Sequence, residues 1–189
     1  MKFAIIDTET TGVDPKKNKI TEIAIIISDG QKILDSFFSL INPQCLIPPF
    51  ISNLTGISNE MVRSAPQFSE LAKTIHMITE DCVFVAHNAR FDYGFVSSEF
   101  SALGNSYIRK TLCTVKLARK VIPKLPSYSL GNLCGSLQIP IESRHRAFGD
   151  AKATSLLLEK LLLADVNQVH LQQIHDPMRL ATKRARAQA

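Results

Sequence analysis

The sequence predicts a mixed-sheet α/β domain, and three observations lead to that prediction. Residues 1–40 contain three strand-like segments separated by short turns, a pattern typical of an antiparallel meander. From residue 66 onward, segments of helical spacing alternate with apolar strand-like segments, as in parallel strands covered by helices. The chain has 189 residues, 45% hydrophobic and 21% charged, which is enough for one domain with its own core. We expect a domain at residues 1–165 and a C-terminal extension with a basic tail at 166–189.

Five segments are expected to form the sheet. The first is a short apolar run without helical period, and it ends in the polar cluster Asp7–Gly12. The second and third flank Asp29 and Gly30, a dipeptide typical of a tight hairpin. The fourth is apolar throughout, as a central parallel strand should be. In chain order the expected strands are Phe3–Ile6, Lys19–Ser28, Lys32–Leu40, Cys82–Ala86 and Ile108–Cys113.

The helices are predicted from apolar residues at helical spacing between turn signals. Pro43, Pro48 and Pro49 indicate a loop before the first small helical region. Pro66 suits the first turn of the next helix, and Gly104 suits the end of the one after it. In chain order the expected helical segments are Ser58–Arg63, Pro66–Ile78, Phe91–Leu103, 114–121, Leu130–Leu137 behind a Ser129 cap, and Phe148–Ala164.

Composition excludes several classes of protein. The longest purely apolar run, Ile23–Ile27, is far too short to span a bilayer. Asp7 interrupts the N-terminal apolar run, and no small-residue cleavage site follows, so we expect no signal peptide and a cytoplasmic location without a membrane partner. The four cysteines form no C-x-x-C pair and are expected to be buried thiols: Cys45, Cys82, Cys113 and Cys134.

The net charge of +5 is unevenly distributed along the chain. Residues 1–99 carry 8 basic and 12 acidic groups, whereas residues 100–141 carry 6 basic groups and no acid. An acidic region beside a basic region suits a metal-dependent enzyme that acts on a polyanion. Uneven distribution of surface charge is, however, also common in proteins without such a function. The basic stretch is interpreted either as a phosphate-tracking surface or as a solvated helix face; its cations are Arg109, Lys110, Lys116, Arg119, Lys120 and Lys124.

Acidic residues stand at the ends of predicted elements. Asp7 and Glu9 follow the first strand, and side chains two apart on a strand point to the same face. Paired carboxylates repel unless protons or cations neutralise them, and oxygen-only ligands suit Mg²⁺ or Mn²⁺. Taken singly, each acid has an ordinary explanation: a turn residue for the pair, and a helix-dipole partner for Asp92 and Asp150. His145 by itself suggests only a solvated loop.

Three motifs occur in order, each at an element boundary, and together they are specific. They are Asp7-Thr8-Glu9-Thr10-Thr11-Gly12, His87-Asn88-Ala89-Arg90-Phe91-Asp92 and His145-Arg146-Ala147-Phe148-Gly149-Asp150. Residues 1–163 thereby resemble the DEDDh, or DnaQ-like, branch of the DEDD 3′→5′ exonucleases, in particular the epsilon subunit of DNA polymerase III. The tyrosine branch would have Tyr where this chain has Arg146.

The resemblance implies a ribonuclease H-like fold and a two-cation mechanism using Mg²⁺ or Mn²⁺. The implied metal-binding carboxylates are Asp7, Glu9, Asp92 and Asp150, with His145 as general base. Substrate contacts are implied for Thr10, Thr11, Phe50, Leu54, Thr55, Asn88 and His145. Proofreading relatives often have His where this chain has Thr55, which leaves the nucleotide preference open. From the residues themselves, Phe50 is a candidate stacking residue, whereas Phe91 and Phe148 are expected in the core.

The leading hypothesis is a 3′→5′ exonuclease that releases 5′-mononucleotides from single-stranded DNA, in proofreading or repair, with a polymerase or other repair protein as a possible partner. A ribonuclease of the same branch, trimming RNA 3′ ends or oligoribonucleotides, is the first alternative, because no residue fixes the sugar. A non-catalytic nucleic-acid-binding or scaffolding module is the second. No G-x-x-x-x-G-K-[ST] motif is present, which disfavours an ATPase.

The last 13 residues contain four basic residues and no acid. We interpret them as an arm that contacts nucleic-acid phosphates without sequence preference. The alternative is a solvated tail without function. The four cations are Arg179, Lys183, Arg184 and Arg186.

Overall fold

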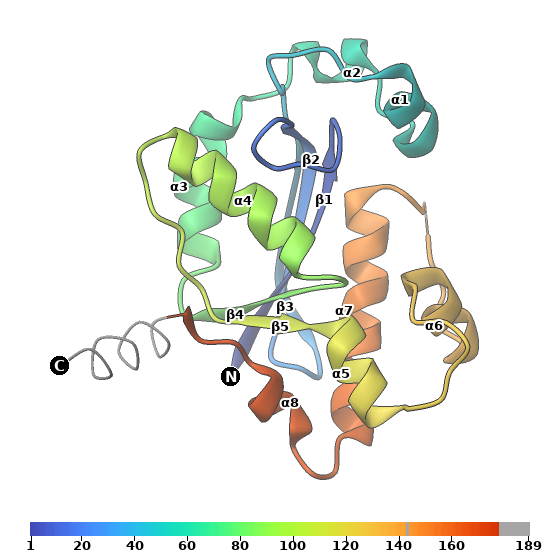
Figure 1. Cartoon of the computed structure of the whole chain (residues 1–189). Helices are drawn as coiled ribbons and strands as arrows, with labels where there is room; N and C mark the ends of the chain where they lie inside the picture. Colours follow the sequence, from blue (N-terminus) through green and yellow to red (C-terminus); the bar gives the residue numbers. More distant parts are fainter. Residues whose placement is uncertain (143, 178–189) are drawn as a thin grey trace, which may run out of the picture.

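A computed structural model of the chain describes residues 1–142 and 144–177, and it contains a five-stranded mixed sheet (Figure 1). The strand order is β3-β2-β1-β4-β5, antiparallel on the β3 side of β1 and parallel on the β4 side. This confirms the predicted meander followed by parallel strands. The strands are β1 (Lys2–Thr10), β2 (Ile20–Ser28), β3 (Ile33–Leu40), β4 (Cys82–Ala86) and β5 (Thr111–Cys113).

Helices cover both faces of the sheet (Figure 1). One face is covered by one group of helices and the other face by a second group. Side chains alternate along β1, so Ala4 and Ile6 pack against the first group of helices, whereas Phe3 and Ile5 pack against the second. The first group is α3 (Phe68–Ile78) and α4 (Arg90–Ala102), and the second is α5 (Thr114–Val121), α6 (Leu130–Ser136) and α7 (Ala147–Ala164). The described part of the chain has no helix long and apolar enough to cross a membrane.

Two short helices lie at the end of the sheet near the start of α7 (Figure 1). They are α1 (Pro49–Thr55) and α2 (Asn59–Arg63). The predicted loop is present up to Pro48, but its continuation to Ser58 was wrong, because Pro49 occupies the first turn of α1, where a missing N–H costs nothing. Gly56 ends α1 with a φ of 72°, a conformation that glycine adopts without strain. A separate small core stabilises this region; its buried members are Ile47, Ile51, Ile57 and Val62.

Other expectations need smaller corrections. The predicted fifth strand is shorter than expected, since only Thr111–Cys113 pairs with β4. Phe148 is 39% exposed and packs against exposed Phe38 rather than in the core. Cys45 is exposed, contrary to the expected burial. An unpredicted short helix, α8 (Val169–Gln173), precedes a return of the chain to the sheet.

That return is made by His175, which exchanges two backbone hydrogen bonds with Thr111 at N–O distances of 2.9 and 2.8 Å. Lys110 also forms an ion pair with Asp176 at 3.5 Å. The first part of the expected C-terminal extension therefore lies against β5. The division of the chain at residue 165 stays a prediction, and the basic residues 179–186 lie outside the described residues.

Candidate active site

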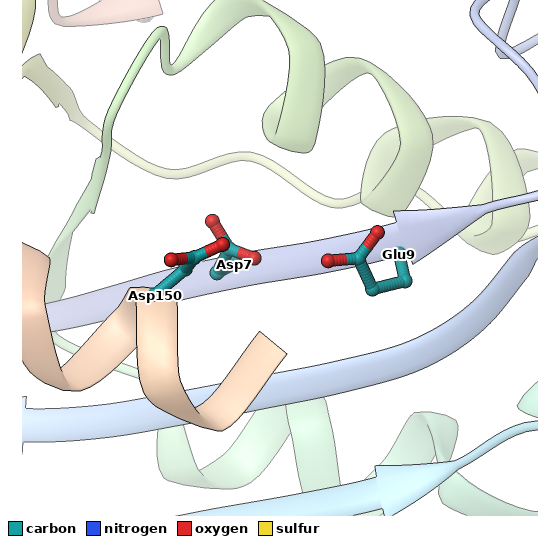
Figure 2. Close-up of side chains that lie close together, drawn as sticks. All are labelled: Asp7, Glu9 and Asp150. Atoms are coloured by element: carbon teal, nitrogen blue, oxygen red, sulfur yellow. The ribbon is translucent and has the colours of Figure 1, made fainter. Parts of the chain in front are cut away.

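Three carboxylates converge on the α7 face of the sheet (Figure 2). Asp7 and Glu9 come from the last part of β1, and Asp150 comes from the first turn of α7. One carboxylate oxygen from each lies within 4.8 Å of the others. The period of β1 places Asp7 and Glu9 on one face, and the packing of α7 across that face brings Asp150 to them.

The cluster is electrostatically unfavourable without a cation. Burial raises the pKa of Asp7 well above 3.8, and repulsion from Asp92, Asp150 and Glu9 adds to this effect. Burial, followed by repulsion from Asp150, raises the pKa of Glu9 to about 8. Burial also raises the pKa of Asp150, although a hydrogen bond from the backbone amide of His145 opposes the shift. A divalent cation would remove this repulsion.

The donor set fits a hard cation. All three side chains offer only oxygen, which Mg²⁺ and Mn²⁺ prefer over softer ligands. The Oδ1 atom of Asp150 is buried and has no hydrogen-bond partner among the described residues. Buried acceptors are normally satisfied, so an unpaired carboxylate oxygen inside an acidic cluster is a candidate metal ligand.

Asp92 occupies a different place from the other three acids. β1 pairs with β4 only from Lys2 to Ile5, so the rest of β1 extends beyond β4. Asp92, at the start of α4, accepts hydrogen bonds from the backbone amide of Thr8 at 3.0 Å and from its hydroxyl at 2.9 Å. Burial raises the pKa of Asp92 to about 7, and the bonds from Thr8 oppose the shift. Asp92 is close enough to repel Asp7 but lies outside the three-carboxylate group.

His145 stands two residues before the start of α7, with a φ of 60°. Its backbone amide donates to Asp150 Oδ2 at 3.1 Å, which places the residue beside the carboxylates. The side chain is half-buried, and within residues 1–142 and 144–177 no hydrogen bond holds its imidazole. The ring is thus available to a substrate or a water molecule. Its role as general base stays a prediction.

The side chains expected at the substrate differ in their availability. The hydroxyl of Thr10 donates to Gly12 O, that of Thr11 accepts from Lys19 N, and that of Thr55 donates to Ile51 O. All three threonines are buried, so these hydroxyls would reach a substrate only after their internal hydrogen bonds break. Phe50, Leu54 and Asn88 are exposed, and the first two lie on α1. Their contacts with substrate stay predictions.

Two functional candidates were missed from the sequence, namely Glu22 on β2 and Arg146 before α7. Glu22 is the antiparallel partner of Glu9, and its carboxylate binds the guanidinium of Arg146. The available signal was a single acid inside a strand rich in isoleucine, because buried acids are almost always paired. The predicted cation Arg109 has an internal role instead, since its guanidinium donates to Thr79 O and His76 O.

Comparison with known proteins agrees with this geometry. The family model described as exonuclease, RNase_T, matches residues 4–158. A protein named 3′-5′ exonuclease DinG from Bacillus subtilis (strain 168) is 40% identical over 163 residues, covering 85% of this chain and 18% of that protein. A DNA polymerase III PolC-type protein from Caldanaerobacter subterraneus subsp. tengcongensis is 36% identical over 161 residues, covering 85% of this chain and 12% of its own length.

The solved structure of Exonuclease X in complex with 5′ overhanging duplex DNA has a TM-score of 0.75 and 27% sequence identity. The match covers 90% of this chain and 96% of that one. The mixed sheet with flanking helices is therefore the ribonuclease H-like fold that the motifs implied.

The chain belongs to the RNase_T exonuclease family, and the resemblance to DEDDh 3′→5′ exonucleases is confirmed. It spans less than a fifth of the length of the DinG and PolC-type relatives.

Proposed function

We propose that this domain is a divalent-cation-dependent 3′→5′ exonuclease that removes 5′-mononucleotides from the 3′ end of single-stranded DNA. The observation that carries the proposal is the group formed by Asp7, Glu9 and Asp150, whose charges need a cation, with His145 beside it. The name of the PolC-type relative, a DNA polymerase, and the DNA-bound structure of Exonuclease X support DNA as the substrate.

In this proposal the carboxylates bind the cations and His145 acts as the general base. When bound, divalent cations supply charge stabilisation to the attacking and leaving oxygens of the phosphodiester. Asp7, Glu9 and Asp150 would hold the cations, and Asp92, which is close enough to repel Asp7, stays the predicted fourth metal-binding carboxylate. His145 accepts a proton from water as the water oxygen bonds to phosphorus. The bond from phosphorus to the 3′ oxygen breaks, and that oxygen takes a proton from solvent.

Exposed apolar side chains support a single-stranded substrate. Phe50 and Leu54 are 67% and 55% exposed on α1, which lies at the same end of the sheet as the start of α7 (Figure 1). Unpaired bases stack on exposed aromatic side chains such as Phe50, whereas bases within a duplex are already stacked on each other. We include in the proposal a cytoplasmic location and, because of the PolC-type relatives, work beside a polymerase or another repair protein.

The test is incubation of the purified protein with 5′-labelled single-stranded DNA and RNA of one sequence, with Mg²⁺, Mn²⁺ or a chelator. We expect a ladder of DNA shortened from the 3′ end, no product with chelator, and little product from DNA with a blocked 3′ terminus. Faster degradation of RNA would favour the ribonuclease alternative. No product from either substrate with both metals would refute the proposal.

A further inference from the structure

A partly buried ion pair joins β2 to the segment that carries His145. Glu22 is only 4% exposed, and its carboxylate accepts from Arg146 Nε at 3.1 and 3.2 Å and from Nη2 at 2.5 Å. The same carboxylate accepts a hydrogen bond from the backbone amide of Ala147 at 2.9 Å. Glu22 thus holds both the side chain of Arg146 and the peptide that follows it.

The pair replaces the local cap of α7. Arg146 is the N-cap residue, yet no side chain near it in sequence caps the helix. Glu22, which is 125 residues from Ala147 along the chain, satisfies a first-turn N–H and places negative charge at the positive end of the helix. Its position is set by β1, because Glu22 is the antiparallel partner of Glu9.

The contact between Glu22 and the start of α7 joins the two elements that carry the carboxylates, β1 and α7. β1 supplies Asp7 and Glu9, while the start of α7 supplies Asp150 together with the preceding His145. His145 is held through its backbone amide to Asp150, and Asp150 is held by its own amide to Arg146 O at 3.1 Å. Fixing Arg146 against β2 therefore fixes the distance between the two halves.

Stability alone gives little reason for a charged pair here. Burying the carboxylate of Glu22 is costly, and the Arg146 side chain, which stays 39% exposed, offsets only part of that cost through a partly solvated ion pair. A further carboxylate beside Glu9 also adds repulsion, which Arg146 has to offset. The planar guanidinium, bound through two nitrogens, instead provides direction as well as attraction.

We propose that Glu22 and Arg146 are positioning residues, which set the placement of His145 and Asp150 relative to Asp7 and Glu9 during phosphodiester hydrolysis. This inference rests on the proposed exonuclease function. In this proposal Glu22 and Arg146 act through the residues that they hold and not through the reacting atoms.

The test uses Glu22→Gln, Arg146→Lys and Arg146→Gln, with Glu99→Gln as the matched control. Glu99 is 7% exposed, binds Lys19 Nζ at 3.0 Å and accepts from Ile20 N at 3.3 Å, so it is also a buried acid that holds one cation and one backbone amide. For each variant kcat, KM and Tm are measured, together with amide hydrogen exchange over residues 144–150.

We expect Glu22→Gln to lower kcat about 10- to 100-fold with KM nearly unchanged, as for other residues that orient metal ligands. Arg146→Lys should keep more kcat than Arg146→Gln, because it retains the charge but not the planar fork. Exchange over residues 144–150 should accelerate in Glu22→Gln and stay unchanged in Glu99→Gln, whatever the loss of Tm.

Wild-type kcat in Glu22→Gln, or an equal loss of kcat in Glu22→Gln and Glu99→Gln at equal Tm, would overturn the inference. If Glu22→Gln does not fold, the comparison of Arg146→Lys with Arg146→Gln decides, and equal kcat in the two contradicts it. A wild-type protein without nuclease activity would refute the proposed function instead. Exchange over residues 144–150 would then still test the positioning, and unchanged exchange would overturn it.

Discussion

Asp92 Oδ1 accepts two hydrogen bonds from Thr8, one from its amide at 3.0 Å and one from its hydroxyl at 2.9 Å. Thr8 stands between Asp7 and Glu9, in the part of β1 that extends beyond β4. The side chain of Asp92 thus takes the place of a strand partner for this part of β1. Asp92 therefore has a structural task in addition to its charge near Asp7.

Two substitutions separate these tasks. Asp92→Asn keeps an acceptor oxygen for Thr8 and removes a charge that repels Asp7, so stability should be equal to that of the wild type or higher, with activity strongly reduced. Asp92→Ala leaves buried donors of Thr8 unpaired and should lower the free energy of unfolding by about 1–3 kcal/mol. Urea denaturation and nuclease assays of both variants check this. Equal stability of the two variants would argue against the structural task.

Asp7→Ala or Asp150→Ala should abolish nuclease activity while the fold survives. Removing one carboxylate from a repelling group should leave the metal-free stability equal or higher. Assays with Mg²⁺ and thermal melts in chelator measure the two effects. Asp35→Ala, which removes an exposed acid on β3, is the control and should change neither. Wild-type turnover in Asp7→Ala would contradict the assignment of the metal site.

His145→Ala should lower kcat by about 10²–10⁴-fold, the usual effect of losing a general base. Cation binding should stay nearly unchanged, because oxygens of Asp7, Glu9 and Asp150 hold the metal in our proposal. Calorimetric titration with Mn²⁺ provides the second measurement. If the variant no longer binds Mn²⁺, His145 is a ligand and its assigned role is wrong.

The metal-free protein should lose stability as the pH rises from about 6.5 to 8. The pKa values of Glu9 and Asp92 are raised to about 8 and about 7, so the folded state holds protons that the unfolded state has released. The lowered pKa of His87, caused mainly by burial, acts in the opposite direction only below about 6.5, its ordinary value.

Thermal melts in chelator from pH 6.5 to 8 measure this decline, and millimolar Mg²⁺ should reduce it because the cation binds the deprotonated carboxylates. Glu9→Gln should flatten the decline, since it removes one of the groups that titrate. A Tm that rises with pH in chelator would show that the cluster does not titrate as described.

Deleting residues 178–189 removes four cations predicted to contact phosphates, Arg179, Lys183, Arg184 and Arg186. Each contact on a single strand contributes about −0.7 to the slope of log affinity against log salt, so the slope should flatten by up to roughly 3 units. Turnover at saturating substrate should stay nearly the same. Single-strand binding between low and high salt measures the slope, and an unchanged slope supports the alternative of a tail without function.

Two strands, β2 and β4, could be predicted because they are buried along their whole length, whereas β3 is largely exposed and was located by the turn residues before it. The predicted first strand, Phe3–Ile6, was too short, because β1 continues through the polar residues to Thr10; the catalytic role of that end of β1 stays a prediction. The helix α1 could not be predicted from its prolines. Its seven residues are too few to be stable alone, and burial of Ile51 with Ile57 and Val62 stabilises it.

The sequence by itself determined which acids could act together, because side chains two apart share a face of a strand and the three motifs name a family. Tertiary structure alone decided how they meet. Asp150 joins Asp7 only because α7 crosses the sheet, and Arg146 finds Glu22 at a separation of 124 residues. Local periodicity also could not show that Phe148 points outward or that Arg109 is used internally. The physical reason is that a pattern along one element specifies its faces, whereas the partner of each face is chosen by the packing of the whole chain.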